Sequence, residues 1–107
     1  MSYNLLITKT ARNDLIDAAN YIEYSLKNPI AADNFLDAIE EHIDKLTVFP
    51  DKHPVVDDPV LASWGIRFIV VNNYMVFYIV DNSTVRVIRI LYGKRNWVSI
   101  LKYGIGS

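Results

Sequence analysis

The sequence predicts an α+β fold in which an N-terminal helical hairpin packs on a mostly antiparallel four-stranded sheet, with the elements in the order β-α-α-β-β-β. Two early segments repeat apolar residues at helical spacing, and three later segments are rich in β-branched and aromatic residues and are separated by turn residues. With 107 residues, of which 51% are hydrophobic, the chain suits one domain that spans residues 1–107.

The first half of the chain carries the predicted first strand and both helices. A short apolar run, Tyr3 to Ile7, predicts a strand, and the hydroxyls of Thr8-Lys9-Thr10 can cap a helix that starts near Ala11. Asn28-Pro29 ends this helix, and proline suits the first turn of the next one. The apolar positions at spacings of three and four are Leu15, Ala18, Ala19, Ile22 and Leu26 in the first helix and Ala32, Phe35, Leu36, Ile39, Ile43 and Leu46 in the second.

The second half follows a Pro- and Asp-rich, irregular connection between Pro50 and Pro59. The three predicted strands are Ile66–Val71, Tyr74–Val80 and Val85–Tyr92. Asn72-Asn73 and Asp81-Asn82-Ser83 accept turn conformations, so consecutive strands should pair as an antiparallel meander. A last segment, Arg95 to Lys102, has the pattern of a short C-terminal helix.

The predicted sheet is apolar on both faces. Along its middle strand, Tyr74, Val76, Tyr78 and Val80 alternate with Met75, Phe77 and Ile79. Two helices can cover only one face of a small sheet. The other face is therefore either covered by the C-terminal segment or left for a partner.

Charge is unevenly distributed along the chain, although the net value is only −1. Residues 1–63 carry five Lys/Arg against eleven Asp/Glu, which gives −6, and residues 64–107 carry six against one, which gives +5. Either the helices simply carry solvated acids, or the second half meets an anionic partner.

Several classes of site are excluded by residue type. The absence of cysteine removes disulfides, thiolate metal ligands and cysteine nucleophiles, and is typical of a reducing cytoplasm. No residue spacing suggests a metal or a cofactor site. No apolar run approaches the roughly 18 residues that a membrane span needs, so we expect a cytoplasmic protein without a membrane partner.

Basic residues mark the strands and turns of the second half. Arg67 lies on the first meander strand, Arg86 and Arg89 on the last, and Lys94 and Arg95 just beyond it, with Tyr92 between. If the strands pair as predicted, several of these residues converge at one end of the sheet. Guanidinium groups there could bind phosphate or a partner's carboxylates. Alternatively, Arg86 is merely solvated and Arg89 is locked in an internal ion pair.

Strand alternation also predicts which face each arginine occupies. It places Arg89 on the face of Val87 and Leu91, and Arg86 on the face of Ile88, Ile90 and Tyr92. The two arginines would then serve different surfaces.

Cleavage of RNA would also need groups that transfer protons. His42 falls on the apolar side of the second helix, where a structural histidine is expected, and His53 lies in the Pro-rich connection. Tyr92 is better placed than either histidine. Trp64 and Trp97 could stack on bases, but such residues more often fill a core edge.

The run from Asn73 to Leu101 resembles the C-terminal half of RelE/ParE superfamily toxins. These toxins have a Tyr-x-x-x-Tyr strand, here Tyr74 and Tyr78, followed by an Arg-x-Leu-His-Gly-x-Arg-like ending. The matching residues of that ending are Arg89, Leu91, Tyr92 (in place of the usual histidine), Gly93 and Arg95. The TARNDL start of the first helix and the WGIRF strand that carries Arg67 also fit, so the resemblance spans nearly the whole chain.

The resemblance implies the toxin of a type II toxin–antitoxin, or plasmid stabilisation, module. Such a toxin is held by an antitoxin encoded nearby and arrests growth once the antitoxin is degraded. ParE-like members act on DNA gyrase, and RelE-like members are ribosome-dependent mRNA endonucleases. The nuclease branch typically has an arginine directly after the first tyrosine of the strand, where this chain has Met75. That branch also tends to have a tyrosine near the end of the last segment, where this chain has Leu101, with Tyr103 close by.

These departures favour the ParE-like branch, for which no enzymatic activity is expected. In that branch the target contacts would be Arg89, Tyr92, Lys94 and Arg95. In the RelE-like alternative, Arg67 and Arg95 would bind phosphate and Tyr92 would transfer a proton. A third alternative is a decayed member that only binds its antitoxin.

Overall fold

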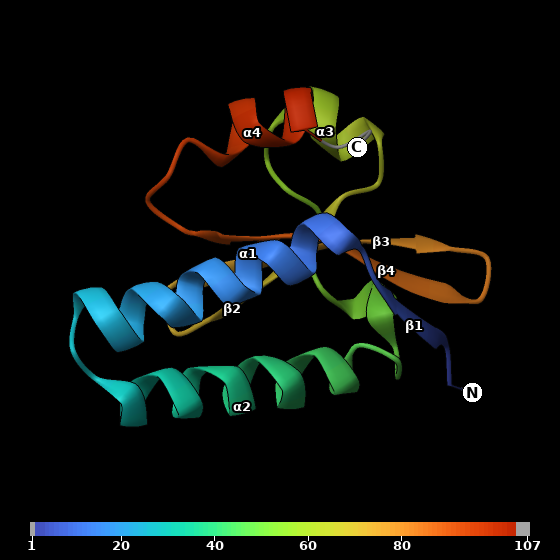
Figure 1. Ribbon diagram of the computed structural model, residues 1–107. Coiled ribbons are helices and arrows are strands. Elements are labelled where there is room, and N and C mark those ends of the chain that lie inside the picture. Colours follow the sequence, from blue (N-terminus) through green and yellow to red (C-terminus); the bar gives the residue numbers. More distant parts are fainter. Residues whose placement is uncertain (1, 105–107) are drawn as a thin grey trace.

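The computed structural model describes residues 2–104 and confirms the predicted element order, with three short helices added (Figure 1). The elements are β1 (Asn4–Ile7), α1 (Lys9–Asn20), the π-helix η1 (Tyr21–Ser25), α2 (Pro29–Lys45), the 3₁₀-helix η2 (Pro50–Lys52), α3 (Pro59–Ser63), β2 (Arg67–Val71), β3 (Tyr74–Asp81), β4 (Thr84–Tyr92) and α4 (Trp97–Gly104).

The sheet has the strand order β1-β4-β3-β2. Strands β2, β3 and β4 form the predicted antiparallel meander, and β1 adds to β4 in parallel. Asn72 and Asn73 both adopt positive φ, at 49° and 70°, as a two-residue hairpin turn with the twist of the sheet requires.

Capping residues define the helical hairpin. The Thr8 hydroxyl accepts a hydrogen bond from the Ala11 backbone N–H, so α1 begins at Lys9, slightly earlier than predicted. The helix then widens into η1 and ends where Lys27 adopts a φ of 54°. Asn28 caps α2 by accepting from the Ala31 N–H at 3.0 Å.

Both faces of the sheet are covered by the chain itself. Figure 1 shows α1 and α2 on one side of the sheet and α3 and α4 on the other. Between the hairpin and the sheet, Phe35, Ile39 and Ile43 pack with Val76 and Tyr78, among others. On the opposite face, the buried residues are Val56, Leu61, Ile66, Phe77, Ile88, Leu91 and Leu101. Coverage by the C-terminal segment, one of the two expected alternatives, is therefore correct.

A β-bulge interrupts the pairing of β3 with β4. Phe77 pairs with Arg89 and Tyr78 pairs with Val87, which leaves Ile88 as an extra residue in β4. The extra residue moves the side chains that follow it to the other face. Val87 therefore lies in the hairpin-side core and Leu91 in the opposite core, so the predicted shared face of Val87, Arg89 and Leu91 is wrong.

The same bulge divides the face predicted for Arg86: Ile88 lies in the same core as Ile79, the pairing partner of Arg86, and Ile90 does not. Ile88 and Ile90, which strict alternation would place together beside it, lie in opposite cores. Alternation holds only within an unbroken strand, and β4 is broken between these two residues.

Beyond the end of β1, the hydrogen bonds at the edge of β4 come from the start of α1 and not from a strand. The pairing of β1 with β4 ends at Ile7 and Val87. Beyond it, the Thr8 N–H donates to the Val87 carbonyl at 3.0 Å, and the carboxylate of Asp14 accepts from the Ile90 N–H at 3.0 Å. The N-terminal segment thus satisfies the edge of β4 beyond the end of β1.

Candidate functional site

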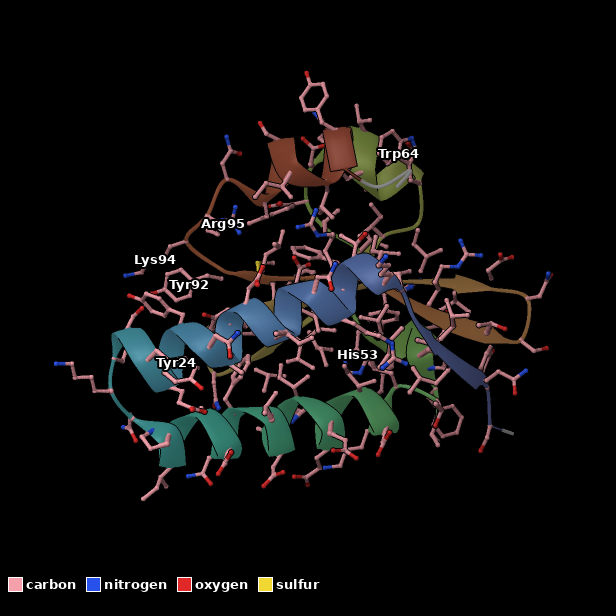
Figure 2. All side chains as sticks on the ribbon, viewed as in Figure 1. Tyr24, His53, Trp64, Tyr92, Lys94 and Arg95 are labelled. Carbon is pink, nitrogen blue, oxygen red and sulfur yellow. The ribbon has the colours of Figure 1, made fainter. Side chains whose placement is uncertain are left out.

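Three of the predicted site residues gather where β4 ends. Tyr92 is the last residue of β4, and Lys94 and Arg95 follow it in a turn closed by a hydrogen bond from the Arg95 N–H to the Tyr92 carbonyl, at 3.0 Å. All three are exposed, and Figure 2 shows them together near the end of the helical hairpin that carries Tyr24. We call Tyr92, Lys94 and Arg95 the basic end.

A groove of about 640 Å³ adjoins the basic end. It lies between α1 and η1 on one side and the ends of β3 and β4 on the other. Its lining residues are Asp14, Asp17, Ala18, Tyr21, Ile22, Leu26, Asn72, Tyr74, Ile90, Leu91, Tyr92 and Arg95. The groove is thus mainly apolar and aromatic, with Arg95 among its lining residues.

Tyrosines hold the strand ends of the groove in place. The rings of Tyr74 and Tyr92 meet at 5.5 Å between centroids, in an edge-on arrangement. Burial raises the pKa of Tyr74, with smaller contributions from nearby Tyr21 and Tyr92. The Tyr74 hydroxyl therefore stays protonated at neutral pH and can donate a hydrogen bond.

Lys94 and Arg95 differ from the other cations of the second half. Of the six Lys/Arg from Trp64 onward, the four others form ion pairs: Arg67–Asp51, Arg86–Asp81, Arg89–Asp14 and Lys102–Asp58. Within residues 2–104, Lys94 and Arg95 take part in none of the ion pairs. The positive charge left available by this half of the chain is therefore concentrated at the basic end.

Arg89, predicted as a target contact, is engaged inside the molecule. Its Nε and one terminal nitrogen donate to the two carboxylate oxygens of Asp14, at 2.7 and 2.8 Å. The two side chains are only 14% and 10% exposed. The alternative of an internal ion pair for Arg89 is therefore the one observed, and the pair lies at the groove.

Asp14 was missed by the sequence reasoning. It accepts three hydrogen bonds, two from Arg89 and one from the Ile90 N–H. One signal was available, because Asp14 lies four residues before Ala18 and hence beside the apolar stripe of its helix. A carboxylate in that position requires a buried partner.

Arg67 does not join the basic end. It begins β2, and the sheet register pairs it with Tyr78, whereas Val71 at the other end of β2 pairs with Tyr74, opposite Tyr92. Four residues of strand separate these positions, roughly 13 Å. The Arg67 guanidinium instead donates to the backbone carbonyls of Asp51 and His53 and fixes that loop.

The two histidines also lie away from the basic end. His53 has its ring 6.4 Å from that of Tyr78, and burial lowers its pKa, assisted by Lys52 and Arg67. Tyr78 is fully buried, and its hydroxyl donates to the Pro50 carbonyl at 2.6 Å. His42 is exposed, which corrects its expected place on the apolar side of α2.

The remaining candidates have structural contacts. Arg86 forms an exposed ion pair with Asp81 at 2.8 Å, next to the turn that joins β3 to β4. Trp97 packs on Phe77 at 5.3 Å between ring centroids, as expected of a tryptophan at a core edge.

Residues 2–104 lack two features that would define other classes of site. None of the helices there is both long and apolar enough to cross a membrane. That part of the chain also contains no group of three or more histidine, aspartate or glutamate side chains arranged to hold a metal ion.

Comparisons with known proteins agree with this fold. The structure is similar to a chain of the chromosomal ParDE toxin–antitoxin system of P. aeruginosa, with a TM-score of 0.70 at 18% identity over 85% of this chain and 96% of that one. It is also similar to a chain of the RelBE2 toxin–antitoxin complex of Mycobacterium tuberculosis, with a TM-score of 0.61 at 21% identity over 86% and 99% of the two chains. At such identities these similarities establish the fold alone.

Comparison of the sequence identifies the family of the chain. No curated protein matches the chain significantly in sequence. Residues 5–97, however, match the family described as the ParE toxin of the type II toxin–antitoxin system parDE. Since this match spans most of the chain, the chain belongs to the ParE family of type II toxins.

Proposed function

We propose that this toxin arrests growth by inhibiting DNA gyrase, and that Tyr92, Lys94 and Arg95 contact the target. One observation carries the proposal: the two cations of the second half that form no ion pair with any residue between 2 and 104 stand together beside an open apolar groove. Unpaired positive charge next to apolar surface is the chemistry of a protein-binding site, in which charges steer association and buried aromatic groups add affinity.

The same geometry argues against the RelE-like alternative. Phosphate cleavage would need Arg67 and Arg95 to act on one group, yet Arg67 lies roughly 13 Å along the sheet and is bound to the loop that contains Asp51. Met75, at the position that typically carries arginine in the nuclease branch, is partly buried against the core on the α3–α4 side.

Arg89, first predicted to contact the target, is instead proposed to position the basic end. Its ion pair with Asp14 holds the end of β4 against α1, and the basic end follows directly. In this proposal Arg89 orients the surface, and Tyr92, Lys94 and Arg95 touch the target.

An antitoxin completes the proposal. Both structural neighbours come from toxin–antitoxin systems, named ParDE and RelBE2. By the same arrangement, this chain would be held in the cytoplasm by an antitoxin encoded beside it, as part of a plasmid stabilisation module, until the antitoxin is degraded.

The test measures both target activities in parallel. The chain is induced in bacteria without an antitoxin, and supercoiling by purified gyrase is assayed beside cleavage of messages on translating ribosomes. The double variant Lys94→Ala/Arg95→Ala should raise the concentration needed to inhibit supercoiling at least tenfold, about 1.4 kcal/mol of binding free energy. Arg86→Ala is the matched control, because it removes an exposed cation outside the groove.

Each result separates the candidates. Lost supercoiling with intact messages supports gyrase as the target. Codon-positioned cuts with normal supercoiling would identify a RelE-like endonuclease instead. If neither activity changes and growth continues, the chain is a module that only binds its antitoxin.

A further inference from the structure

The exposed ring of Tyr92 is the end of a row of three aromatic side chains. The Tyr74 ring meets it edge-on at 5.5 Å between centroids, and Tyr74 also packs against Phe35 at 4.8 Å. Tyr74 and Tyr92 are cross-strand partners in the register of β3 with β4, and Phe35 of α2 is only 2% exposed. Tyr74 therefore connects a side chain fixed in the core to a side chain at the surface.

The backbone beside Tyr92 is held by hydrogen bonds. The Gly93 N–H donates to the Asn73 carbonyl at 2.8 Å, and the Arg95 N–H donates to the Tyr92 carbonyl at 3.0 Å. A Cβ atom at Gly93 would lie 3.2 Å from the Asn73 carbonyl oxygen, so this close approach favours glycine. The turn that carries Lys94 is thus fixed by its backbone, and the orientation of the Tyr92 ring is left to side-chain contacts.

The contact with Tyr74 limits the freedom of Tyr92. Tyr92 is 37% exposed, so without a neighbouring ring its side chain could take other rotamers in solvent. A side chain that is already held in one orientation loses less conformational freedom when it binds a partner. The strength of any contact that Tyr92 makes should therefore depend on Tyr74 behind it.

We propose that Tyr74 is a positioning residue of the toxin, and that its ring fixes Tyr92 in the orientation in which Tyr92 contacts the target. The inference rests on the proposed function and adds a residue of the neighbouring strand on which that contact depends. It also gives the two tyrosines of β3 separate roles, because Tyr78 is fully buried and binds the Pro50 carbonyl.

Two substitutions at Tyr74 separate its ring from its hydroxyl. Tyr74→Leu removes the ring and should raise the toxin concentration that half-inhibits supercoiling about fivefold, which corresponds to about 1 kcal/mol. Tyr74→Phe keeps the ring and should change that concentration less than about twofold. Tyr3→Leu is the matched control, because Tyr3 is also a partly buried tyrosine packed against the same core but does not line the groove.

A double-variant cycle distinguishes positioning from a general loss of structure. If Tyr74 acts through Tyr92, Tyr74→Leu should change the half-inhibiting concentration less than about 1.5-fold once Tyr92→Ala is present. A full fivefold effect in that background would overturn the proposal. Equal effects of Tyr74→Leu and Tyr74→Phe, or of Tyr74→Leu and Tyr3→Leu, would also overturn it.

Nuclear magnetic resonance tests the positioning without gyrase. In the unaltered toxin, nuclear Overhauser effects should connect the ring protons of Tyr74 and Tyr92. In Tyr74→Leu the Tyr92 ring resonances should move toward those of an unfolded peptide, whereas Tyr74→Phe and Tyr3→Leu should leave them in place. Missing Overhauser effects, or unmoved resonances in Tyr74→Leu, would overturn the positioning role.

These measurements also separate this inference from the proposed function. If the unaltered toxin leaves gyrase active, the proposed function fails, and the target contact of Tyr92 fails with it. The resonances of Tyr92 still decide in that case whether Tyr74 fixes its ring.

Discussion

Removal of the Asp14 carboxylate is expected to destabilise the toxin strongly. Breaking a buried ion pair from one side costs about 3–5 kcal/mol, because the remaining charge is left without a partner. Asp14 and Arg89 remain 10% and 14% exposed, so we expect the lower end, about 3 kcal/mol, for Asp14→Ala. This corresponds to a fall in Tm of roughly 12 °C for a domain of this size.

The partner variant should cost less. In Arg89→Ala the carboxylate keeps its hydrogen bond from the Ile90 N–H, and we expect a loss of about 2 kcal/mol. The double variant should lose about 3 kcal/mol, so the coupling energy between the two side chains is about 2 kcal/mol.

Urea unfolding followed by tryptophan fluorescence and circular dichroism measures all three variants. Asp17→Ala, which removes an exposed acid from the same helix, is the control and should change stability by less than about 0.5 kcal/mol. A coupling energy within about 0.5 kcal/mol of zero would refute the role of this ion pair in fixing the end of β4.

Four further predictions concern stability and ionisation away from the groove. Tyr78→Phe removes the buried hydrogen bond to the Pro50 carbonyl and should cost about 1–2 kcal/mol in urea unfolding; an unchanged midpoint would contradict it. Because burial raises the pKa of Tyr78 to about 12, its fluorescence should show no ionisation at pH 10, the ordinary range for tyrosine. Burial lowers the pKa of His53 in the folded protein, so below the ordinary histidine pKa of 6.5 the unfolded chain binds more protons than the folded one. The free energy of unfolding should therefore fall as the pH drops below 6.5. His53→Gln should make this dependence on pH weaker. The hydrogen bond from the Leu61 N–H lowers the pKa of Asp58. The ionised carboxylate therefore stabilises the fold above the ordinary pKa of 3.8, and this stabilisation is lost at lower pH. Asp58→Ala should lower Tm at pH 7 and have little effect on Tm at pH 2.

The fold could be predicted where local chemistry determines it. Thr8 and Asn28 cap their helices because a hydroxyl or amide oxygen satisfies a free N–H of the first turn. Asn72-Asn73 closes a hairpin because asparagine tolerates positive φ at low cost. Each of these signals acts within a few residues.

The bulge in β4 could not be predicted in the same way. One extra residue, Ile88, reverses the faces of every residue after it, although nothing in the neighbouring sequence distinguishes it from an ordinary strand residue. The places of Arg67 and Arg89 likewise depend on partners far along the chain, Asp51 and Asp14. Sequence reasoning therefore singled out the basic residues of the second half and could not tell which of them form ion pairs.

The contact between the N-terminal segment and β4 has a consequence for synthesis of the toxin. The bonds from Thr8 and Asp14 to β4 and Arg89 join residues 75 to 80 positions apart in the sequence. The N-terminal segment leaves the ribosome long before its partner strand is made, and such long-range closure is slow. The basic end therefore takes its place only after β4 has left the ribosome, and a chain that stops before β4 lacks the proposed contact residues Tyr92 and Arg95. In the proposed function, the toxin can contact its target only after β4 has been translated and has closed on the N-terminal segment, which leaves time for an antitoxin already present to meet it.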